Sequence, residues 1–140
     1  MRVDFYHLTQ IPLERALPSI AERVFAGGER LVVVADDDGL LDRLDTALWT
    51  FRSDSFLPHG RVGDQPILLC QPADATAAQN IALADGVWRD IALSFARAFY
   101  FFGSSTIDDA RGAWRALGEN SDVDRHYWKQ DDAGKWVAGP

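Results

Sequence analysis

Residues 31–35 read LVVVA, an unbroken apolar run that is followed directly by three aspartates at 36–38. An apolar run without polar alternation is typical of a strand that is buried on both faces, as in a parallel sheet. A second run, ILLCQ at 67–71, has the same character. Between the two runs, Leu41, Leu44 and Leu48 share one face of a helix that we predict over residues 39–48. A strand, a helix and a second strand in this order predict an open α/β sheet.

The rest of the chain continues the alternation of strands and helices. Strands are predicted over residues 3–8, 81–84 and 96–102, helices over 12–26 and 106–117, and a connection over 45–60. In the first of these helices, Pro18 either introduces a kink or marks the true start. Residues 124–140 are predicted to form an extended aromatic tail that turns at 133–134 and packs back on the body. The sequence thus predicts a single domain over residues 1–140, built on a mainly parallel sheet with flanking helices.

Composition restricts the class of protein. The chain has 140 residues, of which 47% are hydrophobic, and its net charge is −7. It has no apolar run of the roughly 20 residues that span a bilayer, and its N-terminus does not resemble a signal peptide. The single cysteine, Cys70, excludes an internal disulfide. These features predict a cytoplasmic protein without membrane contact, and the acidic charge argues against a nucleic-acid-binding domain.

Sequence motifs of nucleotide-binding and hydrolytic enzymes are absent. The chain contains no GxxxxGK[ST] loop, no GxGxxG after the first strand and no GxSxG elbow. Asp36, Asp37 and Asp38 are the best lead for an enzyme, because they follow a predicted strand at the edge where α/β sheets place ligands. They could hold Mg²⁺ in a metal-dependent phosphotransfer or nucleotide-processing enzyme. Alternatively, one aspartate caps the next helix and the others are solvated.

The connection at 45–60 is unusually rich in large apolar side chains. Its sequence, DTALWTFRSDSFLPHG, carries Trp49, Phe51, Phe56 and Leu57. Loops normally run over the surface, so a loop with aromatic residues either packs them beneath itself or offers them to a partner. Both interpretations remain open at this point.

The predicted helix at 106–117 places Arg111, Trp114 and Arg115 on one surface, since residues three and four apart are neighbours on a helix. A tryptophan between two guanidinium groups can seat an apolar group while the arginines pair with carboxylates. This arrangement suits an acidic peptide that ends in a hydrophobic residue. The alternative is that Trp114 lies in the core beside two solvated arginines.

Several stretches together resemble the chi subunit of bacterial DNA polymerase III. They are FYHL at 5–8, GERLVVVAD at 28–36, LDxxLW at 44–49, SFLPH at 55–59 and NIAL at 80–83. The resemblance covers most of the chain and is most specific at LW followed by SFLPH. It implies a shape similar to Rossmann and P-loop folds without a nucleotide site. It also implies a non-catalytic adaptor that has no metal and no cofactor.

The resemblance also implies partners. One surface would bind psi, or an equivalent protein on the clamp-loader side, and a repair helicase could use the same surface. The residues assigned to it are Trp49, Phe56, Leu57, Pro58 and His59. A second surface would bind the acidic C-terminal tail of single-stranded DNA-binding protein, and its residues are Arg111, Trp114, Arg115 and Ile107. Ile107 lies close to a position where the family has a lysine, which predicts a weakened basic patch. Direct contact with DNA is expected to be weak or absent.

Overall fold

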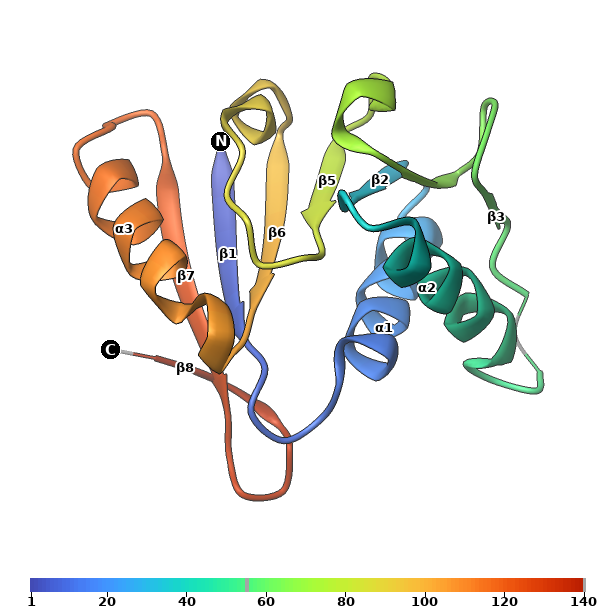
Figure 1. The fold of residues 1–140 in the computed structure, drawn as a ribbon, viewed down its shortest axis with the longest axis horizontal. Helices are drawn as coiled ribbons and strands as arrows, with labels where there is room; N and C mark the ends of the chain where they lie inside the picture. The colour runs from blue at the N-terminus through green and yellow to red at the C-terminus, as the bar shows by residue number, and fades with distance from the viewer. Residues whose placement is uncertain (55, 140) are drawn as a thin grey trace.

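The computed structural model describes residues 1–54 and 56–139, and it contains one eight-stranded sheet with helices on both faces (Figure 1). The strand order is β3-β4-β2-β5-β6-β1-β7-β8. Neighbouring strands in the described part of the chain are parallel except for β7 and β8, which are antiparallel. The prediction of an open, mainly parallel α/β sheet is therefore confirmed.

The elements follow one another as strands separated by helices or short helical turns. Their bounds are β1 Arg2–His7, α1 Leu13–Ala26, β2 Leu31–Val34, α2 Asp38–Thr50, β3 His59–Gly60, β4 Ile67–Cys70, η1 Pro72–Asp74, β5 Asn80–Leu83, η2 Asp90–Ser94, β6 Arg97–Phe102, η3 Ser104–Thr106, α3 Ile107–Leu117, β7 Asp124–Gln130 and β8 Trp136–Ala138. Here η denotes a 3₁₀ helix. Within the described residues, none of these helices combines the length and apolarity needed to cross a membrane.

Two clusters of buried side chains lie on opposite faces of the sheet. The first contains the buried residues of α1 and α2, and the second contains those of α3 and η2. In α2 the predicted stripe of Leu41, Leu44 and Leu48 is buried as expected. Parallel sheets need cover on both faces, which explains why the apolar runs show no alternation.

Two local details differ from simple sequence expectation. Pro18 lies buried inside α1, which begins at Leu13, so Pro18 does not mark the start of the helix. The connection at 45–60 contains a strand that was not predicted, β3, which pairs with β4 at the sheet edge. A strand of two residues is too short to produce a recognisable pattern.

The C-terminal segment is an integral part of the sheet rather than a tail laid against it. Strand β7 pairs in parallel with β1, and the predicted turn occurs at Gly134, whose φ of 82° favours glycine. The Tyr6 ring stacks on Trp128 and meets Trp136 edge-on, with centroids 6.4 and 5.0 Å apart. The Gln130 side-chain oxygen also accepts hydrogen bonds from three backbone N–H groups of residues 9–11. The segment therefore completes the core and fixes the loop after β1.

Candidate functional site

A cavity of about 430 Å³ opens between α3 and the sheet, and we call it the α3 pocket. Its apolar lining residues are Phe5, Phe102, Ile107, Ala110, Trp114 and Tyr127, and its cationic ones are Arg111, Arg115 and Lys129. The structure thus brings together all four residues that the sequence assigned to the second surface. It adds β7 as the opposite wall, which the sequence interpretation did not include.

Trp114 is a rigid wall of the α3 pocket. It is partly buried and meets the rings of Phe5 and Tyr127 edge-on, with centroids 5.1 and 6.3 Å apart. The guanidinium of Arg125 lies 4.2 Å from the ring centroid and donates to the Trp114 carbonyl oxygen. Such edge-to-face and cation–π contacts fix a ring in one orientation. Trp114 therefore serves both the packing beneath α3 and the lining of the pocket, which combines the two interpretations left open by the sequence.

The mouth of the α3 pocket is positively charged, although the whole chain carries a net charge of −7. Arg111 has a loose contact of 3.7 Å with the exposed Asp108, and Arg115 and Lys129 form no ion pair with any described residue. Lys129 was missed because the tail was not interpreted as a strand. On a strand, residues two apart face the same side, so Tyr127 and Lys129 share the side that faces α3.

A histidine lies behind the wall of the α3 pocket. The His7 ring stacks on Phe102 with centroids 4.8 Å apart, and its Nδ1 atom lies 3.2 Å from the Tyr127 hydroxyl. Partial burial lowers the pKa of His7, and the positive charge of Arg111 lowers it further. The neutral imidazole is therefore favoured at pH 7 when the pocket is empty.

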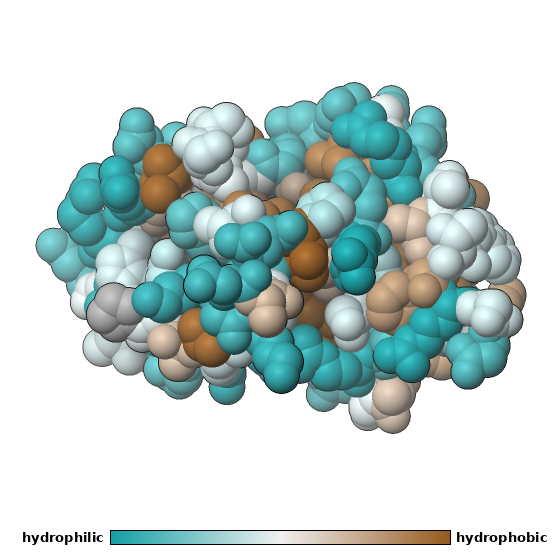
Figure 2. Space-filling model, turned by 90° about the horizontal axis from the view of Figure 1, so that it is seen from below, coloured by the Kyte–Doolittle hydropathy of each residue, from teal (hydrophilic) through white to brown (hydrophobic). Residues whose placement is uncertain are grey.

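The second candidate surface is an exposed pair of rings, Trp49 and Phe56, which we call the aromatic pair. Trp49 is 52% exposed and Phe56 is 66% exposed, and the centroids of their rings lie 5.4 Å apart. Figure 2 views the molecule from below, and white and tan residues lie on its right, the side where α2 lies in Figure 1. Large exposed rings in mutual contact are typical of surfaces that a partner covers.

The residues that follow the aromatic pair are largely internal. Leu57 is 3% exposed and belongs to the core cluster under α1 and α2. His59 is buried, with Nδ1 2.6 Å from the Leu57 carbonyl oxygen and Nε2 3.0 Å from an Asp45 carboxylate oxygen, the latter without hydrogen-bond alignment. Pro58 is partly buried, and Ser55 of the SFLPH motif lies outside the described residues. Leu57 and His59 thus anchor the segment that presents the two rings.

The three aspartates after β2 each have a protein partner. Asp37 caps α2 by accepting a hydrogen bond from the Gly39 N–H at 2.9 Å, and Asp38 pairs with Arg61 at 2.9 Å. Asp36 pairs with Arg89 at 2.9 Å. Among residues 1–54 and 56–139, no group of three or more His, Cys, Asp or Glu side chains is arranged to hold a metal ion. These contacts favour the structural interpretation of the acidic run over the enzymatic one.

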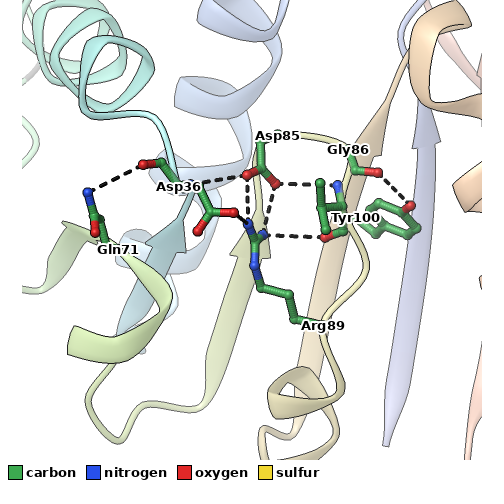
Figure 3. A network of polar contacts seen from close by, with 7 residues as sticks. Asp36, Gln71, Asp85, Gly86, Arg89 and Tyr100 are labelled. Atoms are coloured by element: carbon green, nitrogen blue, oxygen red, sulfur yellow. Dashed lines mark hydrogen bonds and ion pairs between the residues drawn. The ribbon is translucent and has the colours of Figure 1, made fainter.

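Arg89 is the centre of a network that joins the carboxyl ends of β2 and β5 (Figure 3). It donates to both carboxylate oxygens of Asp85, at 2.8 and 2.7 Å. Burial opposes ionisation of Asp85, but the hydrogen bonds, chiefly from Arg89, outweigh it and lower the pKa of the carboxyl. Nearby, the Tyr100 hydroxyl donates to the Gly86 carbonyl oxygen at 2.8 Å, and burial raises the pKa of Tyr100 to about 12. This edge of the sheet is therefore tied together by internal charge pairs.

Comparison with known proteins agrees with the motifs in the sequence. Residues 1–124 match the family model described as DNA polymerase III chi subunit, HolC. The chain belongs to the chi subunit family. It is also similar to the DNA polymerase III subunit chi of Escherichia coli (strain K12), at 33% identity over 54 residues. That alignment spans 39% of this chain and 37% of the length of that relative.

The chi family match ends at residue 124, so it covers α3 but not most of β7. Arg111, Trp114 and Arg115 lie within the matched region, whereas Tyr127 and Lys129 lie beyond it. Two of the nine residues that line the α3 pocket, both on β7, therefore lie outside the part of the chain that the family model describes. The role of Lys129 in binding therefore has to be tested in this chain itself, because the family match does not reach this residue.

Proposed function

We propose that this chi family member is a non-catalytic adaptor of the DNA polymerase III holoenzyme in DNA replication. In this role it links psi, or an equivalent protein on the clamp-loader side, to the C-terminal tail of single-stranded DNA-binding protein. The α3 pocket is the observation that carries the proposal, because it combines an apolar interior with a cationic mouth on an acidic protein. The aromatic pair supports a separate docking surface, which a repair helicase could share.

The α3 pocket has the chemistry that an acidic peptide with a terminal aromatic residue requires. A phenylalanine ring can pack against Trp114 and Ile107, while carboxylates meet Arg111, Arg115 and Lys129. A ligand of a few residues buries little area, so we expect a dissociation constant on the order of micromolar. Exposed charge pairs are screened, so the affinity should fall as salt is added.

Removing Lys129 tests the α3 pocket with little risk to the fold. Lys129→Ala and Arg111→Ala should each weaken binding of an acidic peptide ending in phenylalanine by about 3- to 10-fold at low salt, because each removes one charge partner. Isothermal titration calorimetry at two salt concentrations would measure the change. Trp114→Ala is less informative, because the ring also packs on Phe5 and Tyr127.

Lys135→Ala is the matched control for Lys129→Ala. Lys135 is exposed on the same hairpin and does not line the α3 pocket, so the variant makes the same change in net charge at a different place. If Lys129→Ala and Lys135→Ala weaken peptide binding equally, the loss reflects net charge alone, and Lys129 does not belong to the binding site. Unchanged affinity in both Arg111→Ala and Lys129→Ala would contradict the proposal outright.

His7 should make binding at the α3 pocket depend on pH. Its pKa is lowered in the free protein, and an acidic peptide in the pocket would favour the protonated ring and raise the pKa again. By linkage, lowering the pH from about 7.5 to 5.5 should strengthen binding by about 2- to 5-fold, since peptide carboxylates stay ionised in this range. In calorimetry at both pH values, His7→Gln should lose most of this increase, and His126→Gln should keep it. An unchanged increase in His7→Gln would exclude His7 as its source.

A further inference from the structure

A second cavity, of about 440 Å³, lies on the opposite face of the sheet from the α3 pocket. It is formed where α1 ends and where β1, β5 and β6 begin (Figure 1). Three guanidinium groups border it, from Arg2, Arg23 and Arg97, and we call it the arginine pocket. Neither the aromatic pair nor the α3 pocket shares a residue with it.

A buried carboxylate holds two of the three arginines in place. Asp4 is completely buried, and its oxygens accept hydrogen bonds from Arg2 Nη2 at 2.9 Å, Arg97 Nε at 2.8 Å and Trp128 Nε1 at 2.9 Å. Burial opposes ionisation, yet these hydrogen bonds lower the pKa of Asp4 below its ordinary value. Since burying a carboxylate is costly, this arrangement fixes the two guanidiniums more firmly than exposed pairs would. Both side chains remain more than a third exposed.

Arg97 and Arg23 have N–H groups that donate no hydrogen bond within the described residues. Arg97 uses only its Nε atom for Asp4, and its Nη groups make no hydrogen bond within the described residues. Arg23 forms no ion pair or side-chain hydrogen bond with any residue in the described ranges. Arg2 and Arg97 are also direct neighbours in the β1–β6 register, where two like charges repel each other unless an anion lies between them. Asp4 and Asp124 offset the charge of this pair in part, and Arg23 adds a third guanidinium to the cavity lining.

The interior of the arginine pocket is apolar. Tyr6, Ile20, Val24 and Phe99 contribute to its walls, and the Arg97 guanidinium lies 4.5 Å from the centroid of the Phe99 ring. The carbonyl groups at the end of α1 do not oppose an anion strongly, because backbone N–H groups of residues 27–29 already cap three of them. One rim carboxylate, Glu29, is engaged by the buried Asn80 side chain at 2.9 Å.

We propose that the arginine pocket binds a small anion whose charged group is a phosphate or carboxylate and whose remainder is a compact apolar group. Three guanidiniums and one carboxylate, that of Glu29, line the cavity, while Asp4 lies buried beside Arg2 and Arg97, and Asp124 neighbours Arg2 on β7. Guanidinium forks match the oxygens of such anions. The volume lies in the range typical of small-molecule sites, and the apolar walls accommodate a ring or a short aliphatic chain. The proposal does not depend on the adaptor function.

The test is a titration of the intact chain with phenyl phosphate, followed by ¹H–¹⁵N NMR. We expect saturable shifts that gather at residues 2, 23 and 97, with a dissociation constant below about 10 mM. A parallel titration with benzoate compares the two charged groups. Tighter binding of benzoate than of phenyl phosphate would show that carboxylate is preferred, and weaker binding that phosphate is preferred. Inorganic phosphate should bind more weakly because it lacks the apolar part, and benzylamine should not bind.

Arg23→Gln should weaken phenyl phosphate at least about 5-fold without changing the unfolding curve, because Arg23 is exposed and takes no part in the Asp4 network. Arg15→Gln is the matched control on the same helix, exposed and outside the arginine pocket. Arg111→Gln tests whether phenyl phosphate binds in the α3 pocket instead, and it should leave the affinity unchanged. Shifts confined to residues near Arg111, equal effects of Arg15→Gln and Arg23→Gln, or no saturation would each overturn the proposal. None of these results would affect the peptide-binding tests.

Discussion

Replacing Asp4 with alanine should lower the free energy of unfolding by about 3 kcal/mol, the largest effect that we expect from a single side chain on stability. The carboxylate is fully buried and accepts hydrogen bonds from Arg2, Arg97 and Trp128. Its removal leaves the Trp128 N–H without an acceptor and two neighbouring guanidiniums without an anion between them. Urea denaturation followed by tryptophan fluorescence would measure the loss.

The same network should make the free energy of unfolding fall at acidic pH. Because the pKa of Asp4 in the folded protein lies below its ordinary value of 3.8, its contribution is complete at neutral pH. It is lost as the pH falls from about 4 through the lower pKa of the folded state. Asp108→Ala is the control, since Asp108 is exposed and only loosely paired with Arg111. Similar unfolding curves for Asp4→Ala and Asp108→Ala would contradict the role given to the buried network.

Phe56→Ala should abolish docking of the clamp-loader-side partner and leave the fold intact. An aromatic residue at the centre of an interface typically contributes 2 kcal/mol or more, which corresponds to a loss of affinity of at least about 30-fold. Stability should change by less than about 0.5 kcal/mol, because Phe56 is 66% exposed and packs mainly against Trp49. Co-purification with a psi-containing clamp-loader assembly from the same organism would measure docking.

Val62→Ala is the matched control for the aromatic pair. Val62 is even more exposed, at 78%, and it lies outside the aromatic-rich segment at 45–60. Peptide binding at the α3 pocket should be normal in both variants, because the two surfaces share no residue. If Phe56→Ala unfolds the chain, the ring has a structural role. If the variant docks normally, the aromatic pair is not the interface.

Most of the fold could be predicted from the sequence because a parallel sheet leaves a simple signal. The runs at 31–35 and 67–70 lack charged and amide side chains, since both faces of β2 and β4 are covered. Strand β3 could not be predicted, because two residues carry no periodicity. Strand β7 was missed as a strand because Tyr127 and Trp128 are adjacent and are flanked by polar and charged residues, without the alternation that marks a strand.

The candidate sites could be predicted only in part. Sequence spacing places Arg111, Trp114 and Arg115 together, because neighbours on a helix follow from its geometry. Lys129 enters the same pocket through the pairing of β7 with β1, a long-range contact that spacing does not reveal. In the segment at 45–60, composition alone could not tell that Phe56 is exposed while Leu57, its neighbour in sequence, belongs to the core.

The position of β1 in the sheet has a consequence for how the chain acquires its structure. β1 precedes all other described strands in the chain, yet its only partners in the described sheet are β6 and β7. Contacts between residues so far apart in sequence form slowly, because a long loop must close before they gain any stabilising energy. During synthesis on the ribosome, β1 therefore remains unpaired, with its apolar side chains uncovered, until β6 and β7 have emerged. The same strand then carries Asp4, so the charge network at the arginine pocket is assembled among the last steps of folding.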